Sequence, residues 1–99
     1  MEKQITKSVF VEAREWFDKS GGNSYFSARI SIDGRVVHAL PFQYGYESQY
    51  EHEASKWLMQ EGYLTFAPSP IWNLKQLGID VYTVKYSAKK ADTKRWGKI

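Results

Sequence analysis

The chain contains no cysteine, which excludes disulfide bonds, thiolate zinc sites and cysteine nucleophiles together. With only His38 and His52, it cannot build a metal site mainly from imidazole ligands. No run approaches the roughly 20 apolar residues that cross a bilayer, and the opening stretch MEKQITKSVF lacks the apolar core of a signal peptide. We therefore expect a cytoplasmic protein without a resident metal.

Catalytic signatures are also missing. The sequence has no G-x-S-x-G elbow, Walker loop or dinucleotide fingerprint, so we expect neither an enzyme nor a bound cofactor. A phosphodiesterase that uses His38 or His52 stays open as an alternative. Replacing each histidine by Ala would test it, because the required histidine must abolish turnover when it is removed.

Positive charge is concentrated at one end of the chain. Residues 87–99, SAKKADTKRWGKI, hold five Lys or Arg and one Asp, whereas the rest of the chain carries nine basic and ten acidic residues. A chain of 99 residues has room for one domain. We therefore predict a single domain over residues 1–86 and a flexible basic tail over 87–99, with an electrostatic anchor for a polyanion as the alternative role of the tail.

Aromatic residues are abundant, at 16% of the chain. A core of this size cannot bury them all, so some rings must be partly exposed. Such rings either pack against another copy of the chain or contact a ligand. We expect a homo-oligomer for the first reason and a ligand surface for the second.

The first half of the chain has the alternating pattern of β-strands. Alternation over residues 7–17, 24–32 and 35–42 predicts three strands, and Asp33-Gly34 is typical of a type I′ hairpin turn. The period changes after Ser48: Tyr50, Ala54 and Leu58 fall on one face of a helix over 48–61. Ser48 and Glu51 fit a capping box, and Gly62 fits a helix stop.

A second helix is expected over residues 70–77 and a last strand over 79–87. The predicted order is β-β-β-α-α-β. The simplest way to bury these surfaces is an α+β fold in which a small antiparallel sheet carries both helices on one face.

Two segments are candidates for a binding site. The first hairpin tip combines aromatic rings with glycines, Asn23 and Lys19, and the stretch FQYGYESQY joins the third strand to the first helix. Rings beside a helix N-terminus could stack on a base while the backbone N–H groups hold a phosphate. Burial of the same rings in the core, or in a subunit interface, is the alternative. The predicted ligand-binding residues are Arg14, Trp16, Lys19, Asn23, Tyr25, Arg29, Tyr44, Tyr46 and Tyr50.

The segments REWFDKSGGNSYFSARISIDG and LPFQYGYESQYEHEA resemble small, largely uncharacterised phage and prophage proteins. Those proteins share a Trp-Phe-x-Lys-x-x-Gly-Asn-x-Tyr segment followed by Tyr-Gly-Tyr, and the similarity covers residues 14–54. The resemblance implies a viral origin in the cytoplasm of a host cell and, by analogy, an anti-defence role, but it brings no catalytic residues.

These observations predict a non-enzymatic binding module that holds a nucleotide-like ligand or a short single strand of nucleic acid. The alternative is a protein-interaction module that inhibits a host enzyme through the same aromatic side chains.

Overall fold

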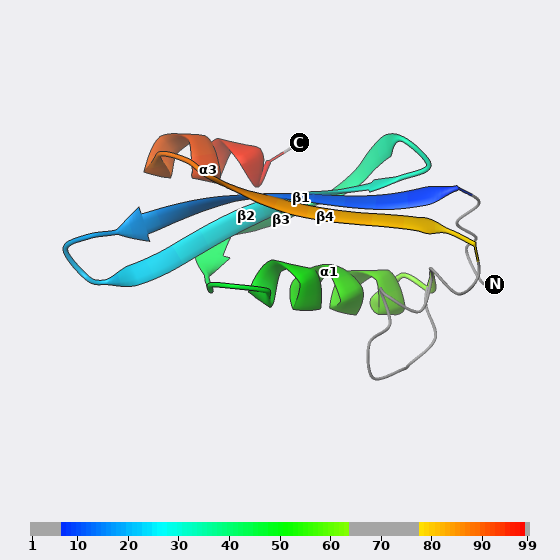
Figure 1. The fold of residues 1–99 in the computed structure, drawn as a ribbon, viewed down its shortest axis with the longest axis horizontal. Coiled ribbons are helices and arrows are strands. Elements are labelled where there is room, and N and C mark those ends of the chain that lie inside the picture. Colours follow the sequence, from blue (N-terminus) through cyan, green and yellow to red (C-terminus); the bar gives the residue numbers. More distant parts are fainter. Residues whose placement is uncertain (1–6, 64–77, 99) are drawn as a thin grey trace.

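The computed structural model describes residues 7–63 and 78–98, which form a small sheet of four strands with a helix on either face (Figure 1). The elements are β1 (Ser8–Asp18), β2 (Asn23–Ile32), β3 (Arg35–Tyr44), α1 (Gln49–Gln60), β4 (Asp80–Ser87) and α3 (Lys90–Trp96). The predicted α+β class is confirmed. The helix expected over 70–77 lies outside the described residues.

The sheet is mixed rather than antiparallel. Its strand order is β3-β2-β1-β4, and β4 pairs with β1 in parallel, with Val9 opposite Val81. The prediction of an antiparallel sheet is therefore wrong for the last strand. The cause is that α1 carries the chain beneath the sheet, so β4 starts at the same end as β1 and runs in the same direction (Figure 1).

The two described helices cover opposite faces of the sheet, which corrects the expectation of helices on one face. In Figure 1, α1 lies below the sheet and α3 above it. The structure also forms a helix where we expected a flexible tail. Seven residues of the segment 87–99 make α3, which contacts β1, β2 and β3.

The core lies between the sheet and α1. Alternate residues of β1 and β2 point down into it, and Val11, Phe26 and Ile30 are almost completely buried. Tyr50, Ala54 and Leu58 of α1 pack against them, as the helical spacing predicts. The other alternate residues of these strands point to the upper face of the sheet. They are more polar and more aromatic than the residues that face the core.

Of the two predictions for the ends of α1, one is confirmed and one is wrong. Gly62 has a φ of 84° and its N–H donates to Met59 O, so the predicted helix stop is confirmed. Ser48 is the N-cap but its side chain makes no capping hydrogen bond, so the predicted capping box is wrong. The Glu51 carboxylate instead accepts hydrogen bonds from the hydroxyls of Thr83 at 2.7 Å and Tyr50 at 3.3 Å, which ties α1 to β4.

A bulge in β3 decides which face the residues after Leu40 occupy. Ala28 pairs with Leu40, but Phe26 pairs with Gln43, so β3 has one extra residue between these pairs. The extra residue inverts the alternation and directs Phe42 to the upper face, where Tyr25 also stands. Pro41 is tolerated here because β3 is an edge strand of the described sheet, where a missing N–H breaks no ladder.

The hairpin between β2 and β3 turns as the sequence predicts: Asp33 and Gly34 have φ angles of 53° and 85°. In residues 7–63 and 78–98, no helix is both long and apolar enough to cross a membrane.

Candidate functional site

Four rings from three strands meet on the upper face of the sheet, near the end where β1 turns into β2. We call Trp16, Tyr25, Phe42 and Tyr44 the aromatic cluster. The Tyr25 ring lies 5.7 Å from Trp16 and 5.3 Å from Phe42 between centroids, with interplanar angles of 30° and 6°. Tyr44 meets the edge of Tyr25 at 5.8 Å and is 59% exposed. The cluster is thus held by its own stacking and remains partly open.

Register explains why these rings meet. Trp16 pairs with Tyr25 across β1 and β2, and Tyr25 pairs with Tyr44 across β2 and β3. Opposite residues in antiparallel strands place their side chains on the same face, within contact distance. Phe42 joins them because the bulge in β3 turns it upward.

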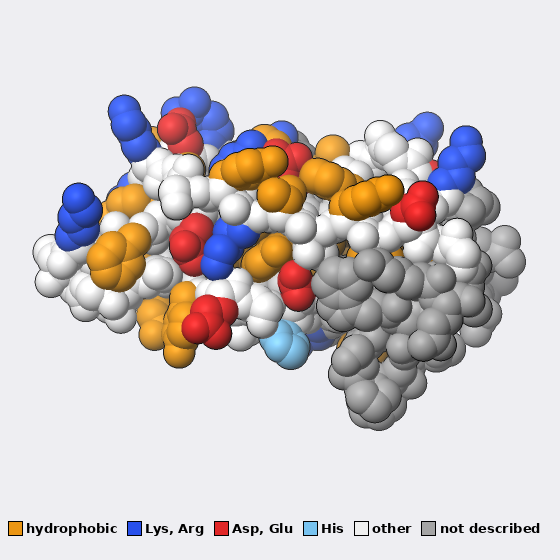
Figure 2. Space-filling model, viewed as in Figure 1, with side chains coloured by type: hydrophobic (Ala, Val, Ile, Leu, Met, Phe, Trp, Pro, Cys, Tyr) orange, Lys and Arg blue, Asp and Glu red, His pale blue; other side chains and the backbone are white. Residues whose placement is uncertain are grey.

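Two lysines of α3 lie over the aromatic cluster. Lys90 Nζ lies 5.1 Å from the centroid of Trp16, and Lys94 Nζ lies 5.5 Å from that of Phe42. Their i, i+4 spacing puts both on the same side of the helix. Figure 2 shows Lys and Arg side chains gathered over the region of α3, at the upper left. Cations of the basic C-terminal segment therefore stand directly beside the rings.

Two arginines of the sheet fix the C-terminal end of α3. The guanidinium carbons of Arg14 and Arg29 lie 4.0 and 3.9 Å from the ring centroid of Trp96. Arg29 donates to the carbonyl oxygens of Trp96 at 3.0 Å and Lys98 at 3.1 Å, and the Trp96 indole N–H donates to Glu12 O at 2.7 Å. Arg14 also forms an ion pair with the Glu12 carboxylate at 2.8 Å. Trp96 is thereby held through cation–π and hydrogen-bond contacts rather than through burial among apolar side chains.

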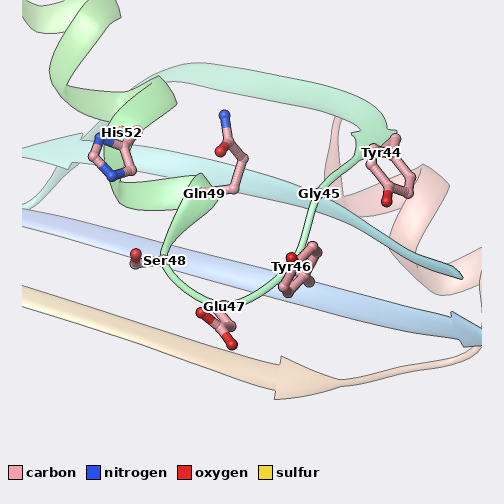
Figure 3. A pocket seen from close by; sticks show the side chains of 7 residues that line it. All are labelled: Tyr44, Gly45, Tyr46, Glu47, Ser48, Gln49 and His52. Atoms are coloured by element: carbon pink, nitrogen blue, oxygen red, sulfur yellow. The ribbon is translucent and has the colours of Figure 1, made fainter.

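The stretch between β3 and α1 lines a second feature, a hollow of about 450 Å³. It is lined by Tyr44, Gly45, Tyr46, Glu47, Ser48, Gln49 and His52 (Figure 3). Figure 3 shows Gln49 and His52 on the first turns of α1, and Tyr44 and Tyr46 on the segment leading to it. Glu47 brings a negative charge to the hollow, and Lys85 is engaged with the Glu47 carbonyl and the Glu15 carboxylate. A carboxylate therefore lies beside the N-terminus of α1, where we expected the backbone N–H groups to hold a phosphate.

The predicted site residues fall into five groups. Trp16, Tyr25 and Tyr44 come together in the aromatic cluster. Arg14 and Arg29 contact Trp96, while Tyr46 is 58% exposed at the hollow. Lys19 and Asn23 lie at the hairpin tip, where the Ser20 hydroxyl donates to Asp18 and lowers the pKa of that carboxyl. Tyr50 is corrected: it is only 7% exposed within the core and cannot stack on a ligand.

Four residues of the upper face were not predicted as site residues: Phe42, Lys90, Lys94 and Trp96. A helical signal was present in the segment that carries the last three, because Asp92 suits a first turn, Lys94 and Arg95 suit a last turn, and Gly97 suits a helix end. The net charge of the segment, on which the prediction of a flexible tail rests, does not reveal this helical pattern.

Neither histidine sits in the aromatic cluster. His38 stacks on Trp57 of α1 at 4.5 Å between centroids, and desolvation by burial lowers its pKa. His52 is exposed at the hollow. Over residues 7–63 and 78–98, no group of three or more His, Asp or Glu side chains could hold a metal ion.

We compared the chain with known protein families, curated proteins and solved structures and found no match. Its function is therefore inferred from the geometry of the upper face.

Proposed function

We propose that this protein is a non-enzymatic module that binds short single-stranded nucleic acid on the upper face of its sheet. The observation that carries the proposal is the aromatic cluster with the ammonium groups of Lys90 and Lys94 above it. Proteins that bind single strands combine rings on which bases stack with cations that follow the phosphates. Both parts are present here within one surface.

A strand fits this surface better than a mononucleotide does. Sites for small molecules are concave and bury most of the ligand. The aromatic cluster instead spans three strands of an open sheet, and the hollow beside it carries Glu47 rather than a free cation. A chain of bases can pass over several rings while its phosphates meet the lysines of α3.

The stacking part of the proposal is tested by replacing Tyr44 with Ala. Tyr44 is the most exposed ring of the cluster, so its removal should disturb folding least. We expect affinity for a fluorescein-labelled heptanucleotide to fall about 5- to 150-fold, the equivalent of the roughly 1 to 3 kcal/mol that one stacked base contributes. Fluorescence anisotropy measures the change. The matched control is Phe17→Ala, which removes a ring that is 52% exposed from the face on which α1 lies. Equal losses in the two variants would contradict the proposal.

The electrostatic part is tested by the double variant Lys90→Ala/Lys94→Ala. Each lysine that neutralises a phosphate adds about 0.7 to the slope of log affinity against log salt concentration. The double variant should therefore lower the magnitude of this slope by roughly 1.4 and weaken binding at low salt. Lys56→Ala, an exposed charge on α1, is the control and should leave the slope unchanged. An unaltered slope in the double variant would refute a phosphate contact at α3.

A second function is favoured by a different observation. Tyr82 and Tyr86 of β4 are 55% and 52% exposed on the upper face. Tyr82 contacts Phe10, and the Arg14 guanidinium lies 5.0 Å from the centroid of the Tyr86 ring. Tyrosine is enriched where protein partners bind, so this part of the face suits a protein-interaction module that inhibits an enzyme. A complex that is captured by wild-type protein, survives nuclease treatment and is lost in Tyr82→Ala/Tyr86→Ala would favour this function over nucleic-acid binding.

A further inference from the structure

Trp96 occupies a place on the sheet that has the chemistry of a nucleotide site. Arg14 and Arg29 lie over its ring at about 4 Å, and guanidinium planes stack on nucleobases in the same manner. Its indole is a flat bicyclic ring comparable in size with a purine. Its N–H donates to Glu12 O, as the amino group of a base could. The ring of this residue is therefore held by the contacts that would hold a base.

The backbone beside Trp96 takes the place of a phosphate. Arg29 gives two hydrogen bonds to carbonyl oxygens, from Nε to Trp96 and from a terminal nitrogen to Lys98. A guanidinium offers the same pair of donors to two oxygens of one phosphate, and such charge-assisted bonds are stronger than those to neutral carbonyls. A phosphodiester could thus compete for Arg29 on favourable terms.

The helix that brings Trp96 here is suited to detachment. It has seven residues, too few for a stable isolated helix, and Thr93 is its only buried residue. Its contacts with the sheet are mainly hydrogen bonds and cation–π contacts. Ser27 donates to Thr93 O, and Trp96 contacts Arg14, Arg29 and Glu12 O. Lys90 and Lys94 lie over rings of the aromatic cluster. Elements with few buried apolar contacts open at low free-energy cost.

We propose that Arg14, Arg29 and Glu12 O form a second nucleotide site, the arginine slot, which Trp96 occupies in cis until a strand bound at the aromatic cluster displaces it. The slot would take one base and its adjoining phosphate. This inference rests on the proposed function, because the cluster supplies the first contacts with the strand. Displacement moves the end of α3 that carries Trp96, while Lys90 and Lys94, nearer the start of the helix, stay beside the cluster.

The experiment compares wild-type protein with Trp96→Ala in the full chain, again with a labelled single-stranded heptanucleotide. Removal of the competing ring should tighten binding about 5- to 20-fold, which corresponds to an open slot in roughly 20% to 5% of wild-type molecules. The slope of log affinity against log salt concentration should stay the same, because Arg29 contacts the phosphate in both complexes once Trp96 has left the slot. Adding Arg29→Ala to Trp96→Ala should abolish the gain in affinity and lower the magnitude of the slope by about 0.7. The matched control is Trp57→Ala, which removes a tryptophan from the α1 side and should not tighten binding.

The possible results distinguish failure of the arginine slot from failure of the aromatic cluster as the binding site. If wild-type protein binds, and loses affinity in Tyr44→Ala, but Trp96→Ala binds no more tightly, the slot is refuted and the proposed function stands. If only Trp96→Ala binds, the slot is supported and the cluster is refuted as the first contact. If neither binds, the proposed function fails, and the slot as a nucleotide site fails with it.

A second readout covers the case in which Trp96→Ala does not fold. The indole N–H of Trp96 gives its own resonance in a ¹⁵N-correlated NMR spectrum of the wild-type protein. Saturation with the heptanucleotide should shift this resonance, because the hydrogen bond to Glu12 O is broken. An unmoved Trp96 resonance in the presence of shifted Trp16 signals would refute displacement.

Discussion

Replacing Phe26 with Ala should lower the free energy of unfolding by about 3 to 5 kcal/mol, the usual cost of removing a large ring from a core. Phe26 is 1% exposed and lies on β2 against the segment that leads into α1. Its ring is part of the core and also lies next to Gly45, in the segment between β3 and α1. Urea denaturation followed by circular dichroism measures the loss.

Gly45 lies against the same ring, so a double-mutant cycle between Gly45 and Phe26 can test whether they compete for space. A Cβ at Gly45 would lie 2.6 Å from Phe26 Cε1 and 2.8 Å from Gln49 Cγ, so Gly45→Ala should cost about 1 to 3 kcal/mol by overpacking. In the Phe26→Ala background the clash with the ring is gone and only the contact with Gln49 Cγ is left, so the cost of Gly45→Ala should be smaller. Strictly additive costs in the cycle would show that Gly45 and Phe26 do not compete for the same space.

Replacing Arg29 with Ala should release the C-terminal helix from the sheet. The change removes hydrogen bonds to two carbonyl oxygens and a stacking contact with Trp96. We expect the free energy that holds α3 closed to fall by about 2 to 4 kcal/mol, since hydrogen bonds from charged groups and cation–π contacts each contribute on this scale. The core between the sheet and α1 does not use Arg29, so its stability should change little.

Hydrogen exchange measured by mass spectrometry tests the release. Amides of residues 90–98 should exchange at least tenfold faster in Arg29→Ala, while those of α1 keep their wild-type rates. Arg29→Lys keeps the charge but loses the planar fork, and it should give an intermediate effect. Arg95→Ala removes an exposed arginine of the same helix and should change nothing beyond its own turn. Uniform acceleration across the whole chain would contradict a local role for Arg29.

Local patterns in the sequence predicted the first half of the fold well. Alternation of Val9, Val11 and Ala13 marked β1, Asp33-Gly34 marked the second turn, and Gly62 marked the end of α1. These features depend on residues that are close together in the chain, so a short stretch of sequence is enough to predict them. The parallel pairing of β4 depends on the end of the sheet to which α1 carries the chain, and no short stretch of sequence determines that.

The site was predictable only in part for a related physical reason. Trp16 and Tyr25 face each other because the first hairpin fixes their register, and their residue types indicated a partly exposed surface. The two arginines were expected to meet a ligand, whereas they meet Trp96 from the far end of the chain. Contacts across more than sixty residues, such as Ser27 with Thr93, leave no local pattern to detect.

The bulge at Pro41 has a consequence for how this surface could arise and be lost. Deleting one residue there would restore simple alternation after Leu40, so Phe42 and Tyr44 would swap sides with their neighbours. A single in-frame codon loss would thus dismantle the upper surface and force two large rings into an already filled interior. Related chains that keep the upper surface should therefore preserve the length of this strand even where they change its side chains.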